Sequence, residues 1–136
     1  MDYIYDMTVF INNNSLKPFK KFRKLYQNAY NENQKNIEAI SISSFSKLSG
    51  MVNARYVNLK FVDDDKFIFF SNYESPKSIE FNSHPQIAAL IYWNSIHTQI
   101  RINASITKTS IDFNKEYFQK RDRRKNALAI SSKQSS

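Results

Sequence analysis

The stretch "TQIRINASI" (residues 98–106) alternates apolar and polar side chains without a break. Ile100, Ile102, Ala104 and Ile106 fall on one side of an extended chain, and Gln99, Arg101, Asn103 and Ser105 fall on the other. This period of two is that of a β-strand with one face in a core and the other toward water. Just before it, "QIAALIYW" (86–93) is almost entirely apolar, which predicts a neighbouring strand buried on both faces.

Three more strands are predicted in the first half of the chain. They are "IEAISISSFS" (37–46), "MVNARYVNLKFV" (51–62) and "FIFFSN" (67–72), separated by the polar turns "KLSG" and "DDDK". Closely spaced strands with few helices predict an antiparallel barrel or sandwich with attached helices, not a doubly wound sheet. The fold class is therefore mainly β (α+β).

Helices are predicted at three places around these strands. In residues 15–33 an apolar stripe recurs at helical spacing, with Pro18 in the first turn. Its members are Phe19, Phe22, Tyr26, Ala29 and Tyr30. A short helix is predicted within 75–85 and a last one from about residue 110. Residues 1–15 are predicted to be a flexible N-terminal arm of a single domain spanning 1–136.

The composition excludes several function classes. The 136 residues include no cysteine, which removes disulfides and cysteine-based metal sites and nucleophiles. The one glycine, Gly50, cannot build a phosphate-binding glycine-rich loop. No leader or long apolar run precedes or crosses the domain, so a cytoplasmic protein without a membrane partner is expected.

The net charge of +8 favours an anionic partner. With His84 and His97 the only histidines, no metal site is predicted. The remaining candidates are cations beside hydroxyls and amides: Arg55, Lys60, Ser71, Lys77, Gln99, Arg121, Gln134 and Ser135. Arg55 and Lys60 are five residues apart, so a regular strand turns them to opposite faces. They can serve one site only if the strand bends or if two subunits contribute.

Six segments, in order, resemble the pyridoxamine 5'-phosphate oxidase family. They are "ARYVNLK" (54–60), "FIFFSN" followed by "ESPK" (67–77), "NSHPQIAALIYW" (82–93), "TQIRINASI" (98–106), "YFQKR" (117–121) and "SSKQSS" (131–136). The resemblance covers about residues 18–136. It implies an antiparallel split β-barrel that forms a homodimer and binds FMN at the subunit interface.

The resemblance also assigns roles to individual residues. It implies FMN contacts from Arg55, Tyr56, Val57, Asn58, Leu59, Lys60, Phe70, Ser71, Lys77, Gln99, Gln134 and Ser135. It implies substrate contacts from Lys60, Tyr117 and Arg121, and from Lys125 in place of a family serine. By composition alone "SSKQSS" predicts a solvated tail; the resemblance makes it part of the site.

Three functions follow as hypotheses. The first is an FMN-dependent oxidase that takes a hydride from a phosphorylated B6 vitamer, giving pyridoxal 5'-phosphate, with no catalytic side chain required. The second is a flavin-binding split barrel with another oxidase activity or none, because the family's C-terminal tryptophan, arginine and Arg-x-His stretch have no counterpart here. The third, least favoured, is a nucleic-acid-binding module that uses "KPFKKFRK" and "KRDRRK".

Overall fold

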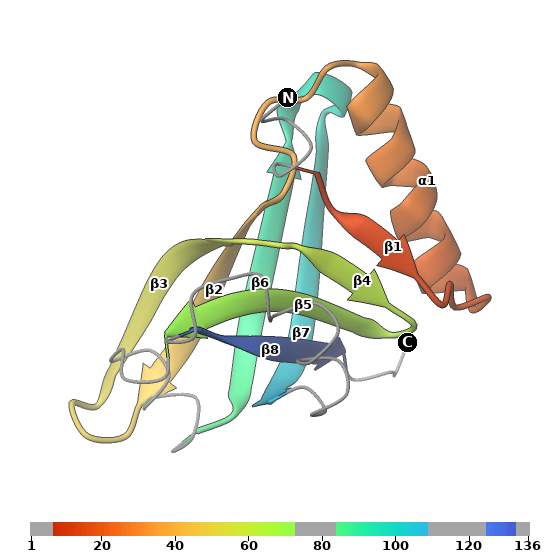
Figure 1. The fold of residues 1–136 in the computed structure, drawn as a ribbon. Coiled ribbons are helices and arrows are strands. Elements are labelled where there is room, and N and C mark those ends of the chain that lie inside the picture. The colour runs from red at the N-terminus through yellow and green to blue at the C-terminus, as the bar shows by residue number, and fades with distance from the viewer. Residues whose placement is uncertain (1–6, 73–83, 109–124, 133–136) are drawn as a thin grey trace.

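The fold, a computed structural model, is one curled sheet with a helix packed on it (Figure 1). The structure describes residues 7–72, 84–108 and 125–132. The described elements are β1 (Val9–Ile11), α1 (Lys17–Asn31), β2 (Ala39–Ser46), β3 (Met51–Asn58), β4 (Phe61–Asp63), β5 (Lys66–Asn72), β6 (Gln86–Trp93), the 3-10 helix η2 (Asn94–Ile96), β7 (Thr98–Lys108) and β8 (Lys125–Ser132). Within these ranges no helix is long and apolar enough to cross a membrane.

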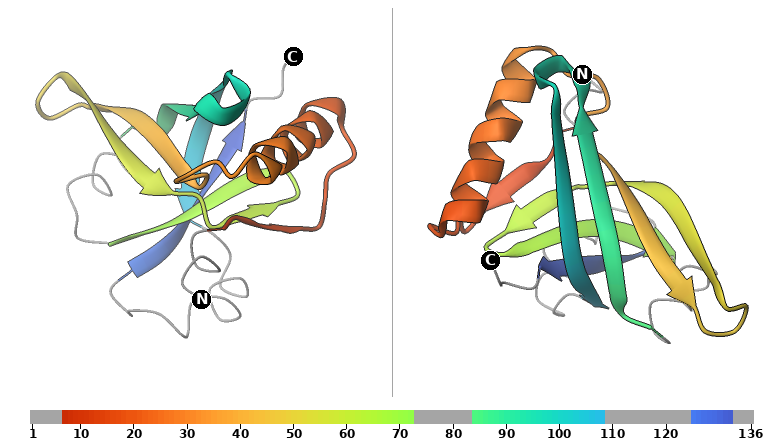
Figure 2. Two further views of the ribbon diagram at one scale, coloured as in Figure 1. Left: turned by 90° about the horizontal axis from the view of Figure 1, so that it is seen from above. Right: turned by 180° about the vertical axis from the view of Figure 1, so that it is seen from behind.

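The eight strands form a single sheet in the order β1-β4-β5-β8-β7-β6-β2-β3. Every pair is antiparallel except β1 with β4. The views from above and behind show β5 and β8 crossing β6 and β7 at a steep angle, so the sheet folds over on itself (Figure 2). This confirms the prediction of a mainly antiparallel split barrel, whose sheet is not closed.

The strand predicted at 51–62 is divided by a bend. β3 ends at Asn58 and β4 begins at Phe61. The Leu59 N–H donates to the carbonyl of Glu38, next to β2, at 2.7 Å. The next N–H, that of Lys60, donates to the carbonyl of Ile68 in β5 at 2.9 Å. Successive residues thus bond to strands in opposite halves of the strand order, and the bend, one of the two alternatives expected for Arg55 and Lys60, is present between them.

Helix α1 closes one side of the core with an aromatic cluster. Phe22 lies 5.1 Å from Phe67 of β5 and 5.6 Å from Trp93 of β6, measured between ring centroids. Tyr26 contacts the same Trp93 edge-on at 5.7 Å. The predicted helical stripe is confirmed for Phe19, Phe22, Tyr26 and Ala29, which are buried, whereas Tyr30 is exposed.

The segment predicted as a flexible arm carries β1 within it. Thr8 is 5% exposed; its N–H donates a hydrogen bond to Tyr26 Oη, and its hydroxyl donates one to the Leu59 carbonyl. Val9–Ile11 then pair in parallel with Phe61–Asp63. The described part of this segment is thereby joined to both α1 and the bend at residues 59–60.

Strand β6 corrects one prediction. Its burial alternates strictly, with Ile87, Ala89, Ile91 and Trp93 inside and the intervening residues outside. The prediction of a strand buried on both faces is wrong for the single chain, because α1 and the curled sheet cover only the inner face. Leu90 and Tyr92 are left 40% and 60% exposed. The alternation predicted for 98–106 is confirmed, with Ile102, Ala104 and Ile106 buried.

Candidate functional site

The outward side chains of four adjacent strands form a continuous surface, here called the outer face. Strand register aligns Tyr56 of β3 with Ser41 of β2, Ser41 with Leu90 of β6, and Leu90 with Arg101 of β7. In the next row Tyr92 stands opposite Gln99. Residues directly opposite in a sheet have neighbouring side chains on the same face. The outer face therefore joins two tyrosines, a leucine, a guanidinium and an amide.

The outer face exposes several large apolar side chains. Tyr56 is 77% exposed, and Leu90, Tyr92 and Val52 are also exposed. An exposed apolar patch bordered by polar groups is typical of a ligand or partner site. Tyrosine rings supply flat surfaces for a planar ligand, and Gln99 and Arg101 supply hydrogen-bond donors beside them.

The predicted FMN segment 55–60 is divided between the two faces of the sheet. Tyr56 is on the outer face and Asn58 is exposed on the same side of β3. Val57 and Leu59 are buried in the core, where only their backbone could meet a ligand. Arg55 stands opposite Ile42, on the inner face, and its Nη1 donates to the hydroxyl of Ser44 at 3.3 Å.

A single chain therefore cannot present Arg55 and Gln99 on one face. Arg55 remains half-exposed near the middle of the β2–β3 hairpin, although it lies on the inner face. Gln99 is exposed on the outer face of β7. Of the two alternatives expected for Arg55 and Lys60, the structure shows the bend, at residues 59–60.

The other predicted residues lie in several places. Phe70 is half-buried in β5, and its ring meets that of Phe61 edge-on at 6.2 Å. Lys60 is half-buried directly after the bend. The backbone of Ser71 lies in β5, and that of Lys125 lies at the start of β8. Outside the described residues lie Lys77, Tyr117, Arg121, Gln134 and Ser135.

Sequence reasoning missed Leu90, Tyr92 and Arg101 as members of the outer face. The strict alternation of 98–106 had already turned Arg101 outward, next to Gln99. Leu90 and Tyr92 belong to an uninterrupted apolar run. Because such a run has no polar residues, its sequence does not indicate which side chains face the core and which face outward.

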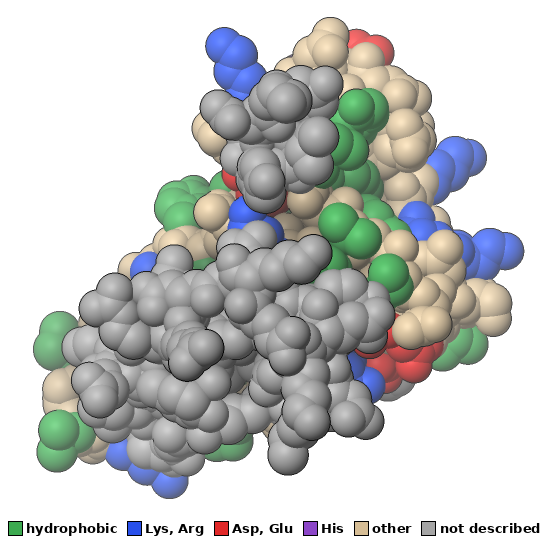
Figure 3. Space-filling model, in the orientation of Figure 1, with side chains coloured by type: hydrophobic (Ala, Val, Ile, Leu, Met, Phe, Trp, Pro, Cys, Tyr) green, Lys and Arg blue, Asp and Glu red, His purple; other side chains and the backbone are tan. Residues whose placement is uncertain are grey.

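Basic side chains gather on a second surface. Lys17, Lys20, Lys21 and Lys24 are exposed on α1, and none forms an ion pair with a described residue. In the space-filling view, Lys and Arg side chains project on the side of the molecule where α1 lies (Figure 3). The helix contains no acidic residue, so this face carries positive charge toward water.

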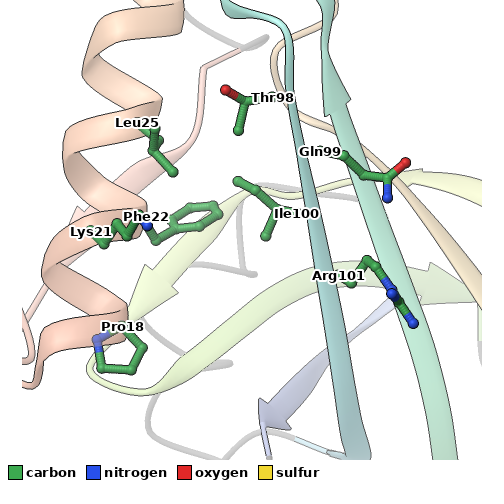
Figure 4. A pocket seen from close by; sticks show the side chains of 8 residues that line it. All are labelled: Pro18, Lys21, Phe22, Leu25, Thr98, Gln99, Ile100 and Arg101. Atoms are coloured by element: carbon green, nitrogen blue, oxygen red, sulfur yellow. The ribbon is translucent and has the colours of Figure 1, made fainter. Parts of the chain in front are cut away.

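A groove runs between α1 and the first half of β7. Its volume is about 480 Å³. The helix contributes one wall and the strand the other (Figure 4); the lining residues are Pro18, Lys21, Phe22, Leu25, Thr98, Gln99, Ile100 and Arg101. Thr98 and Ile100 point toward the helix, whereas Gln99 and Arg101 lie on the opposite side of the strand.

A small polar cluster is buried beneath the bend at residues 59–60. It joins Thr8, Tyr26 and Glu38, and burial raises the pKa of the Tyr26 hydroxyl, an effect that the Thr8 hydrogen bond partly opposes and Glu38 slightly increases. Glu38 is only 7% exposed, and its Oε2 has no hydrogen-bond partner among the described residues. This carboxylate is a local cost to stability that the surrounding contacts must offset.

Comparison with known proteins gives a consistent family assignment. The family model described as pyridoxamine 5'-phosphate oxidase matches residues 26–136. The pyridoxine/pyridoxamine 5'-phosphate oxidase of Colwellia psychrerythraea is 43% identical over 98 residues, which are 72% of this chain and 45% of that protein. The chain spans about half the length of the curated relatives it matches.

Solved structures show the same fold at low sequence identity. PhzG from Burkholderia lata 383, in complex with tetrahydrophenazine-1-carboxylic acid, matches with a TM-score of 0.76 and 15% identity, over 85% of this chain and 76% of that one. A pyridoxamine 5'-phosphate oxidase-related, FMN-binding protein from Nostoc punctiforme matches with a TM-score of 0.69 and 11% identity, over 87% and 82%.

Proposed function

Because this chain belongs to the pyridoxamine 5'-phosphate oxidase family, we propose that it binds FMN and oxidises a phosphorylated B6 vitamer to pyridoxal 5'-phosphate. The observation that carries the proposal is the outer face. Its exposed tyrosines and its amide and guanidinium match, in kind, the flat apolar ring and polar edge of a flavin. The described residues thus fit the cofactor that the family implies.

The site is assembled from two copies of the chain. Arg55 of one copy provides a guanidinium for the phosphate of FMN, and Gln99 of the other provides hydrogen bonds to the ring. Contact between two outer faces also removes Leu90, Tyr92 and Tyr56 from water. Burial of these side chains supplies the driving force for a homodimer.

FMN, when bound, would supply the redox chemistry, as acceptor of a hydride from the substrate with dioxygen as the final oxidant. The chain's own residues bind and orient. Lys60, Tyr117, Arg121 and Lys125 hold the phosphate and ring of the vitamer, as the family resemblance implies. Positioning of two bound reactants is sufficient to lower the barrier substantially, so no protein nucleophile is required.

The first test is the visible spectrum of the protein after FMN addition and desalting. A flavin band near one per chain supports the proposal, and a colourless protein contradicts it. Arg55→Ala should weaken FMN binding by about 1.5–3 kcal/mol, the loss of a charge-assisted hydrogen bond. Lys47→Ala, an exposed cation in the same hairpin, is the matched control and should leave the affinity unchanged.

A second candidate function is oxidation of a different substrate by bound flavin, or flavin binding alone. It is favoured by PhzG, which shares the fold and holds a tetrahydrophenazine carboxylic acid. Turnover of pyridoxamine 5'-phosphate, followed as hydrogen peroxide release, separates the candidates. FMN retention without peroxide would support the second candidate.

A further inference from the structure

The inner face of β2 changes from apolar to polar toward the β2–β3 turn. Ile40 and Ile42 are fully buried, as expected of core residues. The next residue on the same face is Ser44, whose exposed fraction is only 2%. Burying a hydroxyl costs free energy unless the group forms a hydrogen bond, so a serine at this position requires a specific partner.

Arg55 of the neighbouring strand is such a partner. Register sets Ser44 opposite Asn53 and Ile42 opposite Arg55, so Ser44 and Arg55 are diagonal neighbours on the inner face. The Arg55 Nη1 donates to the Ser44 Oγ at 3.3 Å. At Ser44 strand β2 is paired with β3 on one side and with β6 on the other. The hydroxyl oxygen is therefore an acceptor held at a defined place beside a long and flexible side chain.

This bond restricts the orientation of the Arg55 guanidinium. A guanidinium is planar and carries five N–H donors, so a bond from one of them fixes the plane while others can donate to a ligand. An arginine that binds an anion loses side-chain freedom, and a bond formed beforehand removes part of that cost. Arg55 is half-exposed, so a ligand from outside the chain can reach it. The pair therefore presents a cation that is already oriented.

We propose that Ser44 is a positioning residue, which orients the Arg55 guanidinium toward the phosphate of FMN and thereby favours FMN over riboflavin, the same flavin without a phosphate. This rests on the proposed function, in which Arg55 provides a guanidinium for that phosphate. Ser44 acts through Arg55 and does not itself contact the flavin. Selection between the two flavins is a difference of affinities, and an oriented cation raises the affinity only for the flavin that carries the anion.

The first experiment titrates FMN and riboflavin separately into the full chain and into Ser44→Ala. The substitution removes the acceptor of the Arg55 bond and leaves the guanidinium in place. FMN affinity should fall about three- to tenfold, the cost of ordering one long side chain on binding. Riboflavin affinity should stay the same, because riboflavin has no phosphate for Arg55 to meet. An equal fall for both flavins would overturn the proposal.

A double-mutant cycle tests whether Ser44 acts through Arg55. The FMN affinities of Ser44→Ala, of Arg55→Ala and of the double variant are compared with that of the wild type. Residues that contact each other give non-additive effects, whereas independent residues give additive ones. Once Arg55 is absent, the loss of the Ser44 hydroxyl should cause no further loss of FMN affinity. Additive losses would show that Ser44 affects FMN by another route and would overturn the proposal.

Ser46→Ala is the matched control on the same strand. Ser46 is the next inner-face residue and is 8% exposed, but its hydroxyl accepts a hydrogen bond from the Ser49 N–H at 3.2 Å and so belongs to the turn. Its substitution should lower stability without changing the ratio of FMN to riboflavin affinity. Thermal unfolding followed by circular dichroism checks that both variants fold. An equal change of the ratio in both would assign the effect to the hairpin as a whole and overturn the proposal.

The guanidinium signals of Arg55 in the NMR spectrum test the positioning role without flavin. In the wild type they should report slower rotation than in Ser44→Ala, and inorganic phosphate should shift them at lower concentration. If these differences hold but the wild type does not bind FMN, the proposed function fails and the positioning of a phosphate-binding cation is supported. If FMN binds but the Arg55 signals report fast rotation in the wild type itself, the positioning role is wrong and the proposed function stands.

Discussion

At the scale of single residues, the buried cluster of Thr8, Tyr26 and Glu38 has the clearest energetic consequences. Tyr26 Oη accepts a hydrogen bond from the Thr8 N–H at 2.8 Å, and this bond joins the β1 segment to α1. Glu38 lies in the same cluster, and no residue in the described part of the chain bonds to its Oε2. One member stabilises the cluster and another destabilises it, so opposite mutational effects are expected within a few residues.

Tyr26→Phe should lower the free energy of unfolding by about 1–3 kcal/mol, because it leaves the buried Thr8 N–H without an acceptor. Chemical denaturation measures the change. Tyr30→Phe removes a hydroxyl from an exposed tyrosine of the same helix and should change stability by less than about 0.5 kcal/mol. Equal effects of the two substitutions would contradict the importance of the Thr8 bond.

Glu38→Met should raise the free energy of unfolding at neutral pH by about 1 kcal/mol or more, because it replaces an unpaired buried carboxylate with an apolar side chain of similar length. Glu32→Met, at an exposed position, is the comparison. If Glu38→Met destabilises the protein, the carboxylate has a stabilising partner.

The raised pKa of Tyr26 predicts a stability change in alkaline solution. An unfolded tyrosine releases its proton near pH 10, whereas folded Tyr26 retains it to higher pH. Above about pH 10 the folded state therefore binds more protons than the unfolded state, and stability falls as pH rises. Denaturation curves from pH 8 to pH 11 should show a smaller decline for Tyr26→Phe than for the wild type.

At the scale of elements, the β2–β3 hairpin depends on one backbone conformation. Gly50 has a φ of +70°, and a Cβ added there would meet nothing within 4 Å. A substitution at this position therefore tests the backbone alone. The Gly50 N–H also donates to the Ser46 carbonyl at 2.8 Å, which closes the turn.

Gly50→Ala should destabilise the protein by about 1–2 kcal/mol, the cost of the left-handed conformation for a residue with a Cβ. Gly50→Asn should cost less, since asparagine adopts this conformation more readily. Thermal unfolding ranks the two variants. The reverse order would show that side-chain contacts, not backbone conformation, determine the turn.

The sequence predicted the elements whose patterns are local. Period-two alternation identified β7, and helical spacing identified the buried face of α1. β8 was missed, because only the short "ALAI" run is apolar and "KRDRRK" precedes it. β1 was included in an arm, because its pairing with β4 joins residues about fifty positions apart and leaves no local pattern.

The site was predictable only in part for the same reason. The alternation of side chains along a strand places Gln99 and Arg101 on one face of the sheet, and it places Arg55 and Tyr56 on opposite faces. The row that joins Tyr56, Leu90 and Arg101 depends on register across four strands, which no single segment encodes.

At the scale of the whole molecule, the proposed dimer through the outer face predicts that stability depends on protein concentration. Tm should rise with concentration, because dilution favours the separated chains. Tyr92→Lys places a charge in the middle of the outer face and should abolish this dependence, with little effect on Tm in dilute solution. Differential scanning calorimetry across a concentration series provides the measurement, and sedimentation provides the molecular mass.

The position of β5 between β4 and β8 has a consequence for synthesis on the ribosome. β5 pairs with β4 soon after it emerges, but its other neighbour, β8, is the last described strand to be made. Until then one edge of β5, the strand that contains Phe67 and Phe69, lacks its hydrogen-bonding partner while more than fifty further residues are translated. Such a nascent chain is vulnerable to aggregation, and its yield in cells should depend on chaperone supply and on translation speed between residues 72 and 125.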